Sequence, residues 1–239
     1  TSHAGNEYHS RFNHGKFTST TSERSWNFIR RFVYKRNRIG FKQIKNMNKN
    51  RLEAFSDGVL AIIITIMVLE FKVPSDTTFE AVIKLSHKFL SYILSFIYVG
   101  IYWNNHHHLI HSAKNVNGKI LWANLHLLFC LSLIPFATAW IGEHHFAAFP
   151  MMLYGIVLLM NALAYFILQK LILNDHGKDS ALSKAIGKDY KGKASVVLYL
   201  IAVFMTQYSV EVSGSIYILV ALIWLIPDRR IERTFNENK

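Results

Sequence analysis

The sequence predicts an all-α membrane protein with six transmembrane helices in each subunit. Of its 239 residues, 51% are hydrophobic, and these residues come in blocks long enough to cross a bilayer. The hydrocarbon core of a bilayer is about 30 Å thick and takes roughly 20 mostly apolar residues in a helix. Six blocks meet this need, at about 53–72, 87–105, 119–141, 147–172, 193–210 and 213–227. A polar segment at 211–214 separates the last two, which together are too long for one crossing, so a hairpin is expected.

Positive charge alternates between the two ends of these blocks. Residues 1–51 hold 12 Lys and Arg against two acids, and the segments after the second, fourth and sixth blocks are also basic. The segment after the first block holds Lys72, Lys84 and Lys88, and the segments after the third and fifth blocks hold neither Lys nor Arg. Cytoplasmic loops are enriched in these residues, so six crossings of a cell's inner (plasma) membrane with both termini in the cytoplasm are predicted. Lipid headgroups explain the net charge of +12 without a nucleic-acid partner.

Three parts of the chain are distinguished by composition. They are a basic extension at 1–46, a six-span domain at 47–230 and a cytoplasmic tail at 231–239. Within the extension, residues 22–45 interleave aromatic and basic side chains. This pattern is typical of a helix on the cytoplasmic membrane surface, and a disordered tail is the open alternative. No function is attached to the extension, because Met47 is itself a natural start for a bacterial inner-membrane protein.

The first block carries the pattern on which the functional prediction depends. From position 59 to position 69 it is apolar except for Thr65. Because Ile62, Thr65 and Leu69 lie at i, i+3 and i+7, they form one stripe on a helix. Four or more copies of that stripe around an axis would line a narrow pore with two apolar rings and a hydroxyl ring between them. The alternative is ordinary helix packing, with Thr65 bonded to the carbonyl one turn back.

Histidines near the ends of the blocks raise the question of a metal site. His107 and His111 have the i, i+4 spacing of two ligands on one helix face. No carboxylate or thiol lies near them in sequence, and the other pair, His144 and His145, is expected on the opposite side of about 30 Å of hydrocarbon. We therefore expect no metal and no cofactor.

Several motifs in the first three blocks resemble prokaryotic members of the transmembrane protein 175 family of potassium channels. The first block opens with the R-x-x-x-F-S-D pattern, formed by Arg51, Phe55, Ser56 and Asp57. The second and third blocks supply W-x-x-H-H and later polar and apolar matches: Trp103, His106, His107, Trp122, Asn124 and the run Leu133-Ile134-Pro135-Phe136. The resemblance covers about residues 47–230.

The resemblance implies a homotetramer in which the first helices line a central pore that conducts K⁺. Ile62 would form the hydrophobic constriction, Thr65 a hydroxyl layer tied to K⁺ preference and Leu69 a further apolar ring. The chain has no TVGYG filter sequence. A polar network would hold the pore helix in position: Arg51, Phe55, Ser56, Asp57, His106 or His107, Trp122 and Asn124. The expected partners are other copies of the chain, the lipid bilayer and monovalent cations.

Two other kinds of transport remain as alternatives, a secondary transporter and a proton-conducting pore. Secondary transporters are typically built from repeats with helices broken and charged at the bilayer midplane. Here Pro135, expected to bend the third helix or open its hydrogen-bond ladder, is the only midspan break. No Lys, Arg, Asp or Glu lies at the centre of a block. An uncharged middle favours a passive pore, and the absence of a nucleophile–base pair or nucleotide loop argues against an enzyme.

Overall fold

The structure is a computed structural model that describes residues 49–74, 76–113, 115–176 and 189–225. Every regular element among these residues is an α-helix. The chain divides into two units, Thr1–Ile44 and Lys45–Lys239, and all the described residues belong to the second. The expected surface helix at 22–45 and the expected tail at 231–239 lie outside the described residues.

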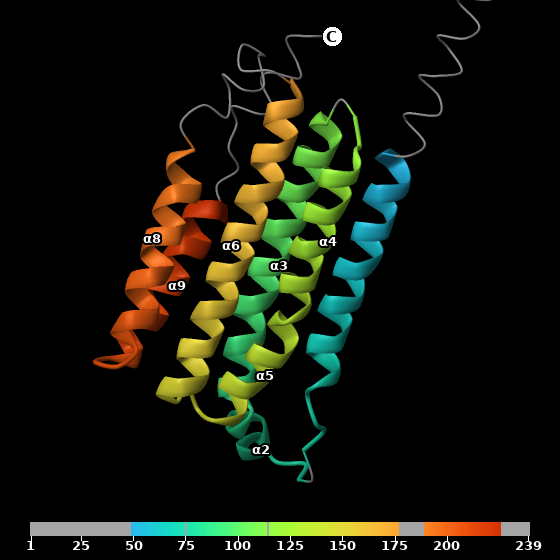
Figure 1. The fold of residues 1–239 in the computed structure, drawn as a ribbon. Coiled ribbons are helices and arrows are strands. Elements are labelled where there is room, and N and C mark those ends of the chain that lie inside the picture. Colours follow the sequence, from blue (N-terminus) through green and yellow to red (C-terminus); the bar gives the residue numbers. More distant parts are fainter. Residues whose placement is uncertain (1–48, 75, 114, 177–188, 226–239) are drawn as a thin grey trace, which may run out of the picture. The chain divides into compact units, whose positions relative to one another are not determined.

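The helices of the second unit form an up-and-down bundle (Figure 1). The first of them, Lys49–Leu69, is the blue helix in Figure 1 and is called the first helix below. It is followed by α2 (Phe79–Lys84), α3 (Ser86–Ser112), α4 (Gly118–Ser132), α5 (Ile134–Glu143), α6 (Ala148–His176), α8 (Tyr190–Met205) and α9 (Val210–Leu225).

Side-chain caps mark where two of these helices begin. The Oδ1 atom of Asn117 accepts a hydrogen bond from the N–H of Ile120 at 3.0 Å, at the start of α4. The Oδ1 atom of Asp189 accepts from the N–H of Gly192 at 2.8 Å, at the start of α8. The first N–H groups of a helix have no partner within it, so an acceptor at this position stabilises the end.

The segmentation differs from the six predicted blocks in two places. The block expected at 119–141 is divided at Leu133 into α4 and α5, with Pro135 in the first turn of α5. Proline has no N–H to donate and is tolerated in a first turn, so the expected effect of Pro135 is confirmed. The short helix α2 was not expected, because its six residues, FEAVIK, are too few and too polar to form an apolar block.

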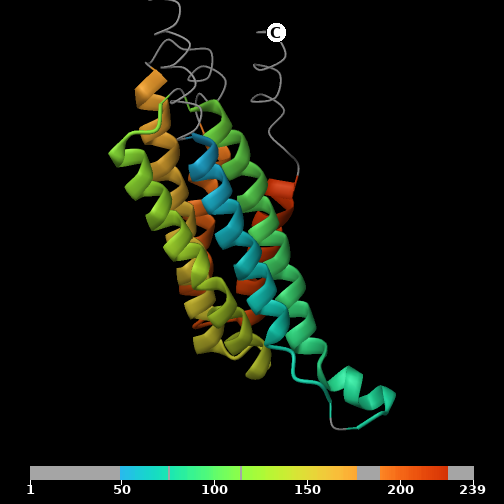
Figure 2. The ribbon, with the colours of Figure 1, turned by 90° about the vertical axis from the view of Figure 1, so that its right-hand side faces the viewer.

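The helices α3 and α6 occupy the centre of the bundle. α3 packs against α5 and α9, and α6 packs against α4, α5 and α8. The first helix lies beside α3 and α4, on the side away from α8 and α9 (Figures 1 and 2). This arrangement leaves one side of the first helix without a neighbour in the described part of the chain.

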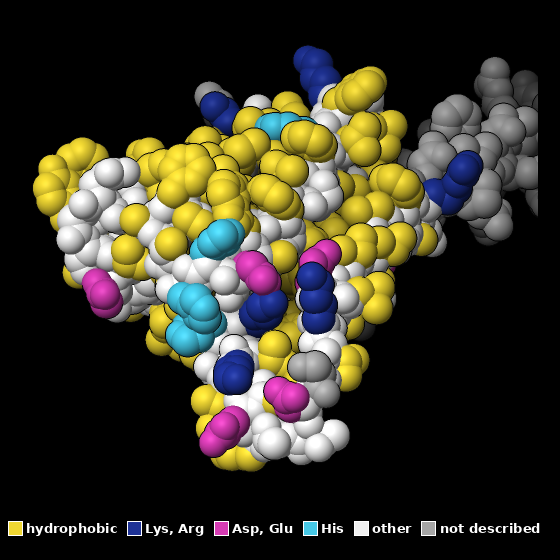
Figure 3. Space-filling view, turned by 90° about the horizontal axis from the view of Figure 1, so that it is seen from below, with side chains coloured by type: hydrophobic (Ala, Val, Ile, Leu, Met, Phe, Trp, Pro, Cys, Tyr) yellow, Lys and Arg dark blue, Asp and Glu magenta, His cyan; other side chains and the backbone are white. Residues whose placement is uncertain are grey.

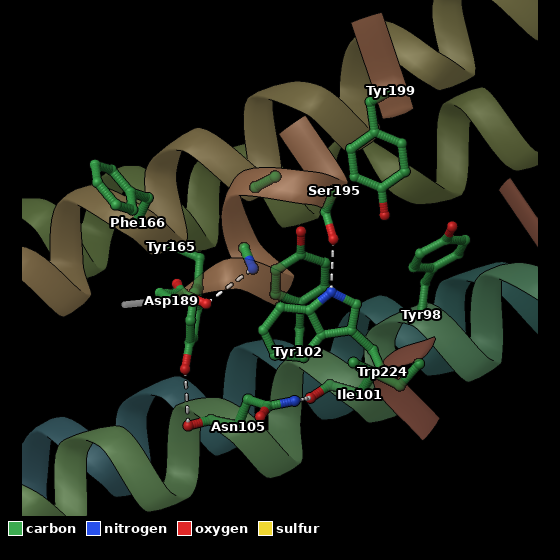
Figure 4. Close-up of a pocket in the computed structure, with 12 residues that line it drawn as sticks. Tyr98, Ile101, Tyr102, Asn105, Tyr165, Phe166, Asp189, Ser195, Tyr199 and Trp224 are labelled. Atoms are coloured by element: carbon green, nitrogen blue, oxygen red, sulfur yellow. Dashed lines mark hydrogen bonds between the residues drawn. The ribbon is translucent and has the colours of Figure 1, made fainter. Parts of the chain in front are cut away.

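Tyrosine rings fill the contact between α3, α6, α8 and α9. Tyr98 and Tyr199 pack with ring centroids 6.4 Å apart, and the Tyr98 hydroxyl donates to the carbonyl of Tyr217 at 2.5 Å. Beside them, in the cavity of Figure 4, the indole N–H of Trp224 donates to Ser195 Oγ at 2.8 Å. Tyrosine hydroxyls and the tryptophan N–H that are hydrogen-bonded inside an apolar bundle hold helices together, because lipid offers these groups no hydrogen-bond partner.

Three of the described helical segments are long and apolar enough to cross a bilayer. They are Lys49–Leu69, Gly118–Glu143 (α4 with α5) and Ala148–Asp175. α9 is apolar but has only 16 residues, and α3 has the length but is less apolar. The remaining predicted crossings stay predictions.

Candidate pore helix and its anchoring network

The first helix has a buried face and an exposed face. The buried face repeats every three or four residues, as a packed helix requires, and consists of Leu52, Ser56, Leu60, Ile63 and Met67. The stripe singled out by spacing lies elsewhere on the helix: Ile62 is 59% exposed, Leu69 is 73% exposed, and Thr65 between them is exposed as well. The described chain therefore packs one side of this helix and leaves the other open.

Hydrogen bonds among three buried side chains join the first helix to α4 and α3. Asn124 Nδ2 donates to Ser56 Oγ at 2.9 Å, and Ser56 Oγ donates to the carbonyl of Leu52 at 2.9 Å. His106 Nε2 lies 2.6 Å from Asn124 Oδ1. Ser56, Asn124 and His106 are each at most 1% exposed. These three side chains are called the anchoring network below.

The anchoring network admits one arrangement of protons. Because the Ser56 hydroxyl donates its only hydrogen to Leu52, it must accept from the amide NH₂ of Asn124. The Asn124 oxygen then faces His106 Nε2, so that nitrogen must carry the ring proton. His106 Nδ1 is left as a buried lone pair with no partner among the described residues. A second ring proton would leave a charged donor buried without an acceptor, so the network holds His106 neutral.

Two further contacts, nearer the surface, hold the first helix against α3. Trp103 Nε1 donates to Asp57 Oδ1 at 3.0 Å, and His107 Nδ1 lies 2.7 Å from Glu53 Oε1. The rings of Trp103 and His107 stack, with centroids 6.3 Å apart. Carboxylates spaced four residues apart thus meet aromatic donors with the same spacing on the facing helix.

The structure separates the expected network residues into two groups. Ser56, Asn124 and His106 meet in the interior, Asp57 bonds Trp103, and His107 pairs with Glu53 instead of Asn124. The choice left open between the two histidines therefore falls on His106. Arg51, Phe55 and Trp122, by contrast, lie exposed outside these contacts.

Helical periodicity explains why those three residues are exposed. Arg51 and Phe55 each lie one residue before the buried Leu52 and Ser56, which places them about 100° around the helix. Trp122 precedes Asn124 by two residues and points to the outside of α4, where it is 74% exposed. Sequence analysis also missed Glu53, whose i, i+4 spacing with Asp57 matches that of Trp103 and His107 and was the available signal.

The exposed stripe presents a hydroxyl oxygen between two apolar side chains. Thr65 Oγ1 donates to the carbonyl of Ala61 at 2.8 Å. With its proton engaged, the oxygen keeps its lone pairs for an outside donor or cation. An apolar groove next to the stripe runs between the first helix and the α4–α5 junction, lined by Ile62, Ile66 and Phe136 among others. The site offers hydrophobic contact and one oxygen layer.

Comparisons with known proteins place these residues in one family. The sequence model described as endosomal/lysosomal potassium channel TMEM175 matches residues 51–135. The chain is similar to a potassium channel of Chryseobacterium sp. (strain P1-3), with 55% identity over 192 residues, 80% of this chain and 100% of that protein. It is also similar to the endosomal/lysosomal proton channel TMEM175 of Homo sapiens, with 35% identity over 96 residues, 35% of this chain and 19% of that protein.

A solved structure shares the fold. The structure is similar to the crystal structure of a lysosomal potassium-selective channel TMEM175 homolog from Chamaesiphon minutus, with a TM-score of 0.66 and 27% sequence identity. The similarity covers 76% of this chain and 98% of that one. The matched segment 51–135 includes the first helix from Arg51 onward, the anchoring network and the exposed stripe.

Proposed function

Because the chain belongs to the TMEM175 family, and is therefore a cation channel of the membrane, we propose that it prefers K⁺ and conducts through a pore lined by the first helix. Four copies surround the axis as a homotetramer. Each copy contributes Ile62 to a hydrophobic constriction, with Thr65 and Leu69 as the layers beyond it. No TVGYG sequence is present to supply a carbonyl filter.

The exposure of one apolar stripe is the observation that supports this proposal most. Ile62 and Leu69 are 59% and 73% exposed, whereas Leu60, Ile63 and Met67 on the same helix are at most 3% exposed. Lipid would accept the two apolar side chains, but it has no donor or cation for the lone pairs of the Thr65 oxygen, whose proton already bonds the Ala61 carbonyl. A shared axis provides an environment for all three, because water and ions reach the hydroxyl there and neighbouring copies cover the apolar rims.

Ion passage in this proposal depends on two physically different layers. A narrow ring of Ile62 side chains excludes water, so an ion loses its hydration there and conduction stops when the ring closes. The ring of Thr65 hydroxyls places oxygen lone pairs one turn further along the helix, where they replace part of the hydration shell. The Leu69 ring narrows the path again beyond the hydroxyls.

The anchoring network sets the rotation of the pore helix in this mechanism. Ser56 lies on the buried face six residues before Ile62, and its bond to Asn124 fixes that face against α4. A rotation by one residue, about 100°, would turn Ile62 away from the axis. The bonds from Trp103 to Asp57 and from His107 to Glu53 oppose the same rotation from α3.

The alternation of Lys and Arg supports an orientation for the tetramer. The basic segments place both termini, and the end of the bundle that holds the anchoring network, on the cytoplasmic side of a cell's inner membrane. The α5–α6 turn and the segment between α8 and α9 then lie on the other side.

Flux measurements on purified protein in liposomes test the proposal. We expect downhill K⁺ flux that needs no second ion, with K⁺ favoured over Na⁺ in the reversal potential. Ile62→Asn should raise the leak of ions, because four asparagine side chains around the pore admit water where four isoleucine side chains exclude it. Val68→Asn is the control, because Val68 is 46% exposed on the same helix but lies about 120° around it from Ile62.

Three outcomes of that experiment count against the proposal. Unchanged currents in Ile62→Asn would remove Ile62 from the constriction, and an equal leak in Val68→Asn would show that any polar substitution loosens the helix. Flux that requires the gradient of a second ion would favour a secondary transporter.

Proton conduction is the second candidate, because the human relative is named a proton channel. No ionisable side chain lies between Gly58 and Leu69, so protons would have to pass along water in the pore. A pH-sensitive dye inside the liposomes distinguishes the two ions. Acidification faster than in protein-free liposomes, and faster still with Ile62→Asn, would show that protons share the path with K⁺.

A further inference from the structure

Two histidines meet at the end of the bundle opposite the anchoring network. His87 lies in the first turn of α3, and His145 follows α5 in the turn to α6. Their Nδ1 atoms are 3.2 Å apart, and their rings meet edge to face with centroids 4.6 Å apart. His145 is exposed and His87 is partly exposed, so solvent reaches the pair. Figure 3 looks onto this end, where histidine, lysine and acidic side chains gather.

The backbone holds His145 in a conformation that few side chains adopt. The N–H of Phe146 donates to the carbonyl of Ile141 at 3.1 Å, the long bond of a Schellman motif at the end of α5. This places His145 where helices usually have glycine, and its φ is 50°. Phe146 follows with a φ of 58°, an outlier for a bulky residue. Strained residues of this kind cluster at functional sites, because the surrounding structure must hold them.

A second contact ties the same two segments together. Lys88 follows His87 on α3, and its ammonium group pairs with the carboxylate of Glu143 at the end of α5. The two backbones that carry the histidines are thus held in place by groups other than the imidazoles. The positions of the two backbones are therefore set before any ligand arrives.

The 3.2 Å between the Nδ1 atoms of His87 and His145 matches the separation of two ligand atoms on one metal ion. A Zn–N bond of about 2.05 Å and a tetrahedral angle place two coordinating nitrogens about 3.3 Å apart. We propose that His87 and His145 bind a divalent transition-metal ion of the Zn²⁺ class, with water at the remaining positions. No group of three or more His, Cys, Asp or Glu is available in the described residues. The site is therefore open and exchangeable, unlike a closed structural zinc site.

A hydrogen bond between the two rings is the competing interpretation of the same distance. In that case one Nδ1 donates a proton to the other, and the pair needs no ion. A metal replaces that proton and requires both lone pairs to converge, which the exposed His145 ring can do by rotating. Metal binding distinguishes the two interpretations directly.

The test measures binding of Zn²⁺, and of Co²⁺ by its tetrahedral absorption bands, to the full chain in detergent with any affinity tag removed. His87→Gln and His145→Asn each remove one ligand, and asparagine is among the residues that best tolerate a positive φ. His144→Gln is the matched control, because His144 is adjacent but packs on Trp140 instead of His87. A metal-free unfolding curve confirms that each variant is folded.

We expect saturable binding and a metal-dependent rise of the unfolding midpoint in the wild type and in His144→Gln. Both should be lost in His87→Gln and in His145→Asn. No saturable binding by the wild type, or equal binding by all four proteins, would overturn the site. Should His145→Asn fail to fold, His145→Gly replaces it. Because the readout is metal binding, the result is independent of the proposed conduction.

Discussion

The first helix carries two hydroxyls that make the same local bond in opposite environments. Ser56 Oγ donates to Leu52 O at 2.9 Å, and Thr65 Oγ1 donates to Ala61 O at 2.8 Å. Ser56 is fully buried and accepts a further bond from Asn124, whereas Thr65 is exposed and has no second partner among the described residues. The same bond to the helix backbone is therefore found in a buried and in an exposed environment.

In the proposed channel, this difference separates the positioning of the helix from conduction. A buried acceptor already engaged by Asn124 contributes to stability and fixes the rotation of the helix. An exposed oxygen contributes little to the stability of the single chain and is left for water, an ion or a neighbouring copy. Substitutions on the two faces should therefore change different measurements.

The largest loss of stability is expected from Asn124→Leu. The substitution leaves the buried Nε2–H of His106 without an acceptor and Ser56 without its donor. The free energy of unfolding should fall by about 3 kcal/mol. Denaturant unfolding in micelles measures it, with Asn105→Leu as control, since among the described residues the Asn105 amide bonds only the Ile101 carbonyl of its own helix. Equal losses in both variants would contradict a special role for the network.

Ser56→Ala should have the next largest effect. It removes the acceptor of Asn124 Nδ2 and leaves that buried donor unpaired, at a cost of about 2 kcal/mol in the free energy of unfolding. The K⁺/Na⁺ reversal potential should not change, because the bonds from Trp103 to Asp57 and from His107 to Glu53 still oppose rotation of the helix. Ser132→Ala is the control, because Ser132 is exposed and, in the described part of the chain, bonds only the carbonyl of Phe129. A changed reversal potential with unchanged stability would reverse the assignment of the two faces.

Trp103→Phe keeps an aromatic ring but removes the indole N–H that donates to Asp57. We expect a loss of about 1 kcal/mol in the free energy of unfolding, because Trp103 is 46% exposed and water competes for the carboxylate. Trp122→Phe, at a side chain 74% exposed, should change it less. A larger effect at Trp122 would indicate that it joins the network in the assembled channel.

Thr65→Val should change stability least and selectivity most. The exposed hydroxyl is replaced by a methyl group of similar size, so the free energy of unfolding should stay within about 0.5 kcal/mol. The reversal potential between K⁺ and Na⁺ should shift toward zero discrimination, because the oxygen layer is lost. Thr65→Ser, which keeps the oxygen, should preserve the preference. An unaltered reversal potential in Thr65→Val would place selectivity elsewhere.

The helical spacing of residues close in sequence was enough to predict one face of the first helix. The spacing of Ile62, Thr65 and Leu69 placed them on one face, and the structure exposes all three. Their role in a pore stays a prediction, since it depends on copies of the chain around an axis. The division of the third block followed from Pro135, because a missing N–H acts wherever the helix lies.

Contacts between helices could not be predicted in the same way. His106 and His107 are adjacent, and the sequence offers no reason for one to bond Asn124 and the other Glu53. The choice depends on how α3 is rotated against the first helix and α4. The pairing of His87 with His145 depends on the positive φ at His145. The sequence gives no sign of this φ, because the position holds histidine where glycine is usual.

The sequence by itself determined the long apolar helices, the stripe at Ile62, Thr65 and Leu69, and the family, because apolar block length, period and motif are properties of neighbouring residues. Only the tertiary structure decided which polar groups are buried together. Burial depends on the packing of whole helices. When a helix turns by about 100° about its axis, the next residue takes the buried position, yet the spacing of residues in the sequence stays the same.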